Sequence, residues 1–243
     1  MALNFLYKQT GIAETTQDRI GTGSFTIDSG IYPAKITKAY LQQAASSKAV
    51  SIVFEFALPD SKTLTETVWV TNKTGENFYM DKKSGKPAYL PGFELASNIS
   101  FVAIGKELAE LTPEPKVIEI YNGELKKKAP TTVQMLMDLV EKEIIVGVQK
   151  VLEYKQAKNQ VTGAYEDTNE TRESNEIVNV FTVAGLTALE VKSGAKEVDF
   201  INKFKEVYTS DYLRDKTKKG GNKPAGAQSP NQGVTTPSLF GAK

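Results

Sequence analysis

The chemistry open to this chain is limited by the side chains that it lacks, because it contains no histidine and no cysteine. Without them, the usual zinc ligand sets and the histidine-activated serine or cysteine nucleophiles cannot form. Carboxylates, lysines, tyrosines and hydroxyls are the reactive groups that remain. We therefore expect a non-catalytic protein without a metal or other cofactor.

Carboxylates leave one catalytic alternative open, a metal-dependent nuclease. Short strings typical of such enzymes occur at Pro59-Asp60, Glu124-Leu125-Lys126 and Glu190-Val191-Lys192. Two-metal hydrolysis needs carboxylates that converge on adjacent ions, and strings this short recur by chance in lysine-rich chains. The acidic run from Glu166 to Glu176 has no glycine where an EF-hand loop requires one. We interpret this run as the solvated tip of a hairpin.

One segment, from Asn72 to Gly92, has the composition of a binding site for single-stranded nucleic acid. Its lysines alternate with aromatic rings, a pattern that can neutralise phosphates and stack bases. The alternative is a solvated loop whose rings hold it against the body of the protein. The candidate residues are Lys73, Phe78, Tyr79, Lys82, Lys83, Lys86 and Tyr89.

Trp69, the only tryptophan, is the strongest single candidate for base stacking. It lies in a predicted strand, Leu64 to Val70, whose aliphatic residues share one phase while Trp69 and two threonines share the other, a phase that Thr71 continues. If the aliphatic face is core, the indole points outward and can stack a base independently of sequence. The alternative is that the N-terminal arm or the Asn72–Gly92 segment covers the ring.

Five further lysines are candidates for phosphate contacts. Lys126, Lys127 and Lys128 form a basic loop after a short strand, and Lys35 and Lys38 lie in the first predicted strand. A lysine triplet is most often only a solvated loop. We expect these residues to extend the aromatic and basic surface if the fold brings them near it.

The hydrophobic periodicity predicts the elements that position these residues. Three strands joined by short loops form an antiparallel meander, which is followed by a helix, a short strand and a long hairpin. A second helix begins at Gly194. The expected strands are Gly30–Tyr40, Val50–Phe56, Leu64–Val70, Lys116–Tyr121, Ile144–Tyr154 and Ile177–Val183, and the first helix spans Phe93–Ala103.

This order predicts a mainly β chain with a few helices (α+β), organised as an OB-like, partly open antiparallel barrel with a helix between strands 3 and 4. A β-sandwich or another small barrel also fits the pattern. The expected organisation is an N-terminal arm (1–23), an OB-like nucleic-acid-binding domain (24–185), a C-terminal helix packed on the barrel (186–213) and a flexible basic tail (214–243).

The predicted tail carries a concentration of positive charge that the net charge of the whole chain conceals. Residues 214–243 contain six basic residues and one acidic residue, although the whole chain has a net charge of only +1. Near the end, Leu239 and Phe240 follow an almost uncharged linker and precede Lys243, a pattern that predicts a partner-docking motif. The alternative is a disordered chain end that binds no partner. The sequence has no long apolar run and no signal-peptide pattern, so we expect a cytoplasmic location.

Several segments resemble phage OB-like single-stranded DNA-binding proteins: Gly30–Ile36, Ser51–Phe56, Val68–Asn72, Asp138–Ile144 and Arg172–Ile177. The resemblance implies a non-catalytic protein that protects single-stranded DNA during phage DNA replication and recombination in the host cytoplasm. It also implies recruitment of a polymerase or RNA polymerase through the C-terminus. A homo-oligomer is compatible with the sequence, which does not fix the oligomeric state. The basic ending departs from the acidic tails common in such proteins. A protein-interaction role, as a transcription cofactor or virion protein, stays open.

Overall fold

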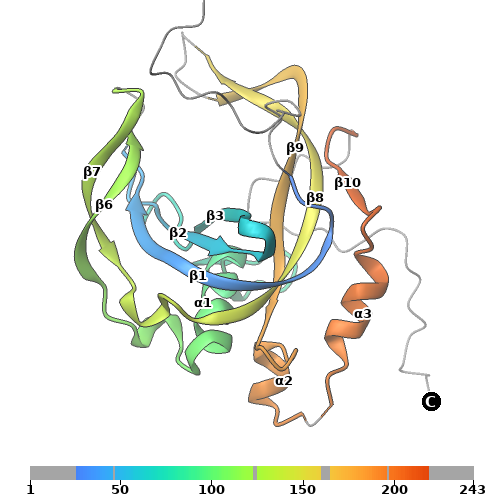
Figure 1. The fold of residues 1–243 in the computed structure, drawn as a ribbon. Coiled ribbons are helices and arrows are strands. Elements are labelled where there is room, and N and C mark those ends of the chain that lie inside the picture. The colour runs from blue at the N-terminus through green and yellow to red at the C-terminus, as the bar shows by residue number, and fades with distance from the viewer. Residues whose placement is uncertain (1–25, 46, 123–124, 160–164, 196, 219–243) are drawn as a thin grey trace, which may run out of the picture.

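The computed structural model describes residues 26–45, 47–122, 125–159, 165–195 and 197–218. Within these ranges the chain is mainly β with three α-helices, which confirms the predicted class (Figure 1). Two short strands, β4 (Phe78–Met80) and β5 (Pro87–Tyr89), form a separate hairpin. The other eight strands form one open sheet: β1 (Gly30–Gln43), β2 (Val50–Ala57), β3 (Thr63–Trp69), β6 (Glu114–Asn122), β7 (Lys127–Met135), β8 (Glu143–Lys158), β9 (Tyr165–Phe181) and β10 (Leu213–Asp215).

Strand β1 is shared between the two halves of the sheet. Residues Gly30–Lys35 pair with β8, and residues from Lys35 to Gln43 pair with β2. The register shifts between Ile36 and Lys38, near the point where the partner changes, and such irregularities bend a strand. Strand β7 then pairs with β1 at Tyr40 and Leu41. The sheet is strongly curved, and its two outer hairpins rise on either side of β1, β2 and β3 (Figure 1).

The main core lies on the face of the meander that the alternation predicts. Its central residues are buried and are covered by helix α1 (Pro91–Ile104), which follows β3 as expected. Pro91 opens this helix at a position where its missing N–H is not needed, and Gly105 ends it with a left-handed φ of 72°. The core residues that β2, β3 and α1 contribute include Ile52, Phe54, Phe56, Leu64, Val68, Ala96 and Ile99.

The sheet stays open between β3 and β9. No backbone ladder joins these two strands in the described chain. Instead, the Ile177 N–H donates to Glu66 Oε2 at 3.2 Å, and α1 packs against both strands. Burial raises the pKa of Glu66 to about 7; the Ile177 hydrogen bond and Lys216 oppose this shift, and Glu176 adds to it. The Glu66 side chain and helix α1 therefore bridge the seam.

Two short helices lie near the end of the described chain, where the sequence predicted one. Helix α2 (Ala188–Lys192) ends before Gly194, and helix α3 (Phe200–Val207) begins later than expected. Ile201 and Phe204 of α3 pack against Phe181 of β9. Close packing of α3 depends on Gly147 of β8, since a Cβ at this position would lie 2.6 Å from the Phe204 ring.

The acidic run was wrongly predicted to be a hairpin tip. Residues 166–176 lie within β9 and pair with β8. This part of the hairpin is exposed on both faces, so it carries no apolar alternation, and cross-strand ion pairs join its strands. Arg172 lies 2.9 Å from Glu153, and Lys155 lies 2.8 Å from Glu170.

The predicted start of the tail is also corrected. Arg214 and Asp215 belong to β10, which runs parallel to β8, and the Lys216 N–H donates to the Leu152 carbonyl at 2.9 Å. Residues 219–243 and the arm expected at 1–23 lie outside the described residues. None of the described helices is long and apolar enough to cross a membrane.

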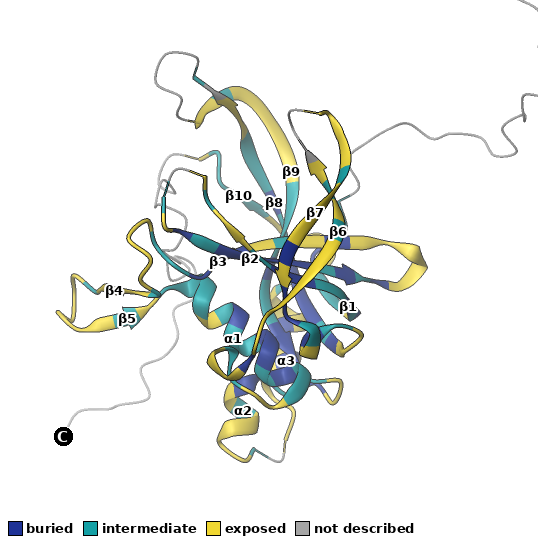
Figure 2. Ribbon diagram, turned by 90° about the vertical axis from the view of Figure 1, so that its left-hand side faces the viewer, coloured by how far each residue is buried: buried dark blue, intermediate teal, exposed yellow. Residues whose placement is uncertain are grey.

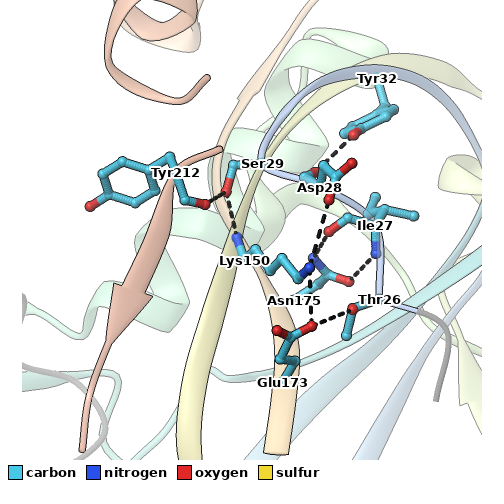
Figure 3. A network of polar contacts seen from close by, with 9 residues as sticks. All are labelled: Thr26, Ile27, Asp28, Ser29, Tyr32, Lys150, Glu173, Asn175 and Tyr212. Carbon is cyan, nitrogen blue, oxygen red and sulfur yellow. Dashed lines mark hydrogen bonds and ion pairs between the residues drawn. The ribbon is translucent and has the colours of Figure 1, made fainter. Parts of the chain in front are cut away.

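A network of hydrogen bonds and ion pairs connects the first described residues, before β1, and the residues just before β10 to strands β8 and β9 (Figure 3). Asn175 pairs with the backbone of Ile27 in both directions, at 2.9 and 2.8 Å. The Ser29 hydroxyl accepts the Lys150 N–H at 2.8 Å and donates to the Tyr212 carbonyl at 2.7 Å. The Lys150 ammonium lies 3.0 Å from Glu173. Ser29 is thus the point where β8, the entry to β1 and the entry to β10 meet.

Candidate nucleic-acid interface

The side of β1, β2 and β3 that faces away from α1 is the outer face. The strand registers align three rows of side chains across it, because directly paired residues in antiparallel strands point to the same side. The rows are Trp69–Ser51–Gln42, Thr67–Val53–Tyr40 and Thr65–Glu55–Lys38. The outer face therefore carries a tryptophan at one corner and a Lys–Glu pair at the opposite corner.

Trp69 lies on this outer face as its phase predicts. Leu64, Val68 and Val70 are buried on the other side, while Trp69 keeps 45% of its surface exposed. A Cβ at Gly92 would lie 2.2 Å from the Trp69 carbonyl oxygen, so the start of α1 packs directly on the backbone of this residue. The close packing fixes the strand end, and the indole remains accessible for stacking.

The predicted lysine and aromatic segment forms the ordered hairpin β4–β5. Phe78 and Tyr89 are direct cross-strand partners, and the Tyr89 ring lies 5.0 Å from the Phe93 ring of α1. Phe78, Tyr79 and Tyr89 are all exposed. Because Phe93 follows Gly92, which touches Trp69, the hairpin and Trp69 are neighbours at the end of β3. Tyr89 holds the hairpin against α1 through Phe93, as the alternative of a solvated loop expects, and the three rings of the hairpin still expose part of their surface to solvent.

A tight turn presents the lysines of this hairpin. The Asp81 carboxylate accepts the Lys83 N–H at 3.1 Å and the Ser84 hydroxyl at 2.7 Å. These bonds, led by the Ser84 hydroxyl, lower the pKa of Asp81. Lys73, Lys82, Lys83 and Lys86 are exposed, and none of them forms an ion pair with another described residue. We call the group formed by Trp69, the β4–β5 hairpin with Phe93, and these four lysines the β3 platform.

Lys35 and Lys38 are less available than the sequence suggests. Lys38 Nζ lies 2.9 Å from Glu55, and Lys35 pairs with Glu141. The hydrogen bond to Glu141 raises the pKa of Lys35. Both ammonium groups are already neutralised, so their net contribution to phosphate binding is smaller than that of the hairpin lysines.

Lys126, Lys127 and Lys128 lie at the far end of the β6–β7 hairpin, where the last two open β7. Figure 2 shows this end well separated from β4 and β5. Near the base of the hairpin, Val133 and Met135 pack onto Tyr40 and Val53. The hairpin therefore covers the β1 side of the outer face and leaves the β3 side exposed. The structure does not bring the predicted lysines together into one patch.

Of the candidate residues for catalysis, Glu124 lies outside the described residues. No group of three or more carboxylates that could hold a metal ion occurs among the described residues. Glu190 has a local structural role, since it accepts the Thr187 and Phe200 N–H groups at 2.8 and 3.0 Å. The predicted docking residues Leu239, Phe240 and Lys243 lie outside the described residues.

Comparison with known proteins does not place the chain in a family. No protein-family model and no curated protein sequence matches it.

Proposed function

We propose that this chain is a non-catalytic, sequence-independent single-stranded DNA-binding protein, and that the β3 platform holds the strand. The observation that carries this proposal is the exposed Trp69 ring beside a hairpin of exposed aromatic and basic side chains. Stacking on each ring contributes about 1–3 kcal/mol per base and needs no particular sequence. The function that follows is protection of single strands during phage DNA replication and recombination.

The chain topology supports an OB-like, partly open barrel. Strands β1, β2 and β3 form a meander, α1 follows, and β8 and β9 return so that β8 pairs with the first half of β1. This order supports an OB-fold in which β6–β7 is an insertion after the helix. The outer faces of strands 2 and 3, which bind oligonucleotides in that fold, correspond here to β2 and β3.

The four lysines of the β3 platform give the proposal a measurable salt dependence. For single-stranded DNA, the logarithm of the binding constant falls linearly with the logarithm of the salt concentration, and each neutralised phosphate contributes about −0.7 to that slope. If each of the four lysines neutralises one phosphate, the slope should be about −3. Lys35 and Lys38 should add little, since carboxylates already pair with them.

Fluorescence titration with an oligothymidine strand tests the proposal directly, because Trp69 is the only tryptophan. We expect quenching on binding and weaker affinity for a duplex of equal length. Replacing Lys82, Lys83 and Lys86 by alanine should flatten the salt slope. The matched control replaces Lys126, Lys127 and Lys128 and, on a strand too short to bind two copies, should change the slope less. Equal affinity for duplex, or an unchanged tryptophan signal at saturation, would contradict the proposal.

We further propose that the C-terminal segment recruits a replication or transcription protein, such as a polymerase, through Leu239 and Phe240 beside Lys243. The basis is the sequence pattern of two apolar residues after a polar linker. Deletion of residues 238–243 should leave strand affinity intact and abolish binding to the partner. If this deletion lowers DNA affinity as much as deletion from residue 219, the docking role is wrong.

A further inference from the structure

Two hairpins project from the same side of the sheet. The first arm is β6–β7 beyond its junction with β1, and the second arm is β8–β9 beyond Leu152 and Glu173. Figure 1 shows them on opposite flanks of β1, β2 and β3, and Figure 2 shows both rising above the body. Neither arm has a third strand along its outer part in the described chain. Two-stranded hairpins in water are only marginally stable without further packing.

The first arm exposes apolar and basic groups together. Val117 and Tyr121 alternate onto the same face of β6 and are 68% and 64% exposed. Lys126, Lys127 and Lys128 follow at the end of the arm, and no described carboxylate lies within ion-pair distance of them. Exposed apolar surface rimmed by charge is typical of an interaction surface.

The second arm offers the complementary surface. Three of its carboxylates are already paired, since Glu153, Glu170 and Glu173 contact Arg172, Lys155 and Lys150. Glu166 instead accepts a hydrogen bond from the Asn159 amide at 2.9 Å, and Asp167 accepts one from the Gln156 amide at 3.1 Å. These are the only hydrogen bonds that the two carboxylates form with described side chains. Tyr165, next to them, is 68% exposed. The end of this arm therefore combines an aromatic ring with carboxylates that form no ion pair with any cation whose side chain is described; the side chain of Lys158 is outside that description.

We propose that the first arm of one copy binds the second arm of another copy, head to tail. The two surfaces are complementary because the arms carry opposite charges and each exposes a tyrosine. Because the arms lie on opposite flanks of the sheet, each arm of one copy contacts a different neighbouring copy. Two different surfaces meeting in this way form a closed ring or an open chain of copies, depending on the rotation between neighbours. The contact does not depend on the proposed function. On a shared DNA strand, however, the high effective concentration would turn a weak contact into cooperative binding.

Sedimentation velocity without DNA tests the contact. Wild-type protein at about 100 μM should associate at about 50 mM salt and dissociate at about 500 mM, where screening is nearly complete. Reversing the first arm (Lys126→Glu, Lys127→Glu, Lys128→Glu) should weaken association at least tenfold. Reversing the second arm (Glu166→Lys, Asp167→Lys) should do the same. The two reversals combined in one chain should restore association, because the charges again oppose each other.

The matched control places the same charge change on β4–β5 (Lys82→Glu, Lys83→Glu, Lys86→Glu) and should keep wild-type association. Circular dichroism melting checks that each variant is folded, as expected for exposed positions. A wild-type protein that is monomeric at both salt concentrations would overturn the proposal. So would a control that dissociates as much as the arm variants, or a combined variant that stays dissociated. Loss of DNA binding alone would leave it standing.

Discussion

Replacing Glu66 by glutamine tests how the seam between β3 and β9 is held. The amide keeps an oxygen that can accept the Ile177 N–H, so the 3.2 Å bridge can persist, but the group can no longer ionise. Wild-type Glu66 has a pKa raised from 4.5 to about 7, chiefly by burial. The folded state therefore favours the protonated carboxyl more than the unfolded state does.

The sign of the effect follows from linkage. Stability from this group is fully present below pH 4.5, falls as the pH rises toward 7, and levels off above the folded pKa. One pKa unit corresponds to 1.36 kcal/mol, so the shift of the Glu66 pKa changes the free energy of unfolding by about 3 kcal/mol at most. We expect about 1–2 kcal/mol, because the residue keeps some solvent contact and Lys216 can approach when Glu66 ionises.

The assay is denaturant unfolding at pH 5 and pH 8. Glu66→Gln should be close to wild type near pH 5 and more stable than wild type by about 1–2 kcal/mol at pH 8. Glu206→Gln, an exposed control on α3, should keep the wild-type pH dependence. If Glu66→Gln loses as much stability between pH 5 and pH 8 as wild type does, burial does not perturb Glu66 and the account of the seam is wrong.

Three further substitutions test other parts of the structure. Trp69→Ala should weaken oligothymidine binding by about 1–3 kcal/mol with little change in melting temperature, because the ring is exposed; a large fall in melting temperature with unchanged affinity would assign the ring to the core. Gly147→Ala should cost about 1–3 kcal/mol in denaturant unfolding, since its Cβ would press on the Phe204 ring; a neutral result would mean that α3 shifts freely. Ser29→Ala should cost about 1–3 kcal/mol, because the Lys150 N–H and the Tyr212 carbonyl both lose a partner; unchanged hydrogen exchange at Lys150 would count against this.

The meander could be predicted from the sequence because its two faces differ. Ile52, Phe54 and Phe56 alternate with smaller or more polar residues, which indicates both the strand and the side that is buried. The same reasoning placed Trp69 on the outer face only if the aliphatic face is core, and the structure meets this condition, since Leu64 and Val68 are buried and Trp69 is 45% exposed. Local periodicity is informative where one face of a strand packs and the other meets water.

The arms could not be predicted in this way. In β9 the residues from Glu166 to Arg172 meet water on both faces, so nothing in their order distinguishes a strand from a loop. Strands β4, β5 and β10 contain three residues each and are too short to show a period. The neutralisation of Lys38 by Glu55 depends on the register between β1 and β2, which the sequence does not specify residue by residue.

The hydroxyl of Ser29 has a consequence for the order in which the molecule folds. Its contact with the Tyr212 carbonyl joins residues that are 183 positions apart in the chain. Closing so long a loop early would cost more conformational entropy than forming the meander, whose partners are close in sequence. We therefore expect the meander and the β8–β9 hairpin to form first and β10 to dock last. A nascent chain would accordingly expose the edge of β8 beyond Val148 until Leu213–Asp215 have emerged, which makes that edge the vulnerable surface during synthesis.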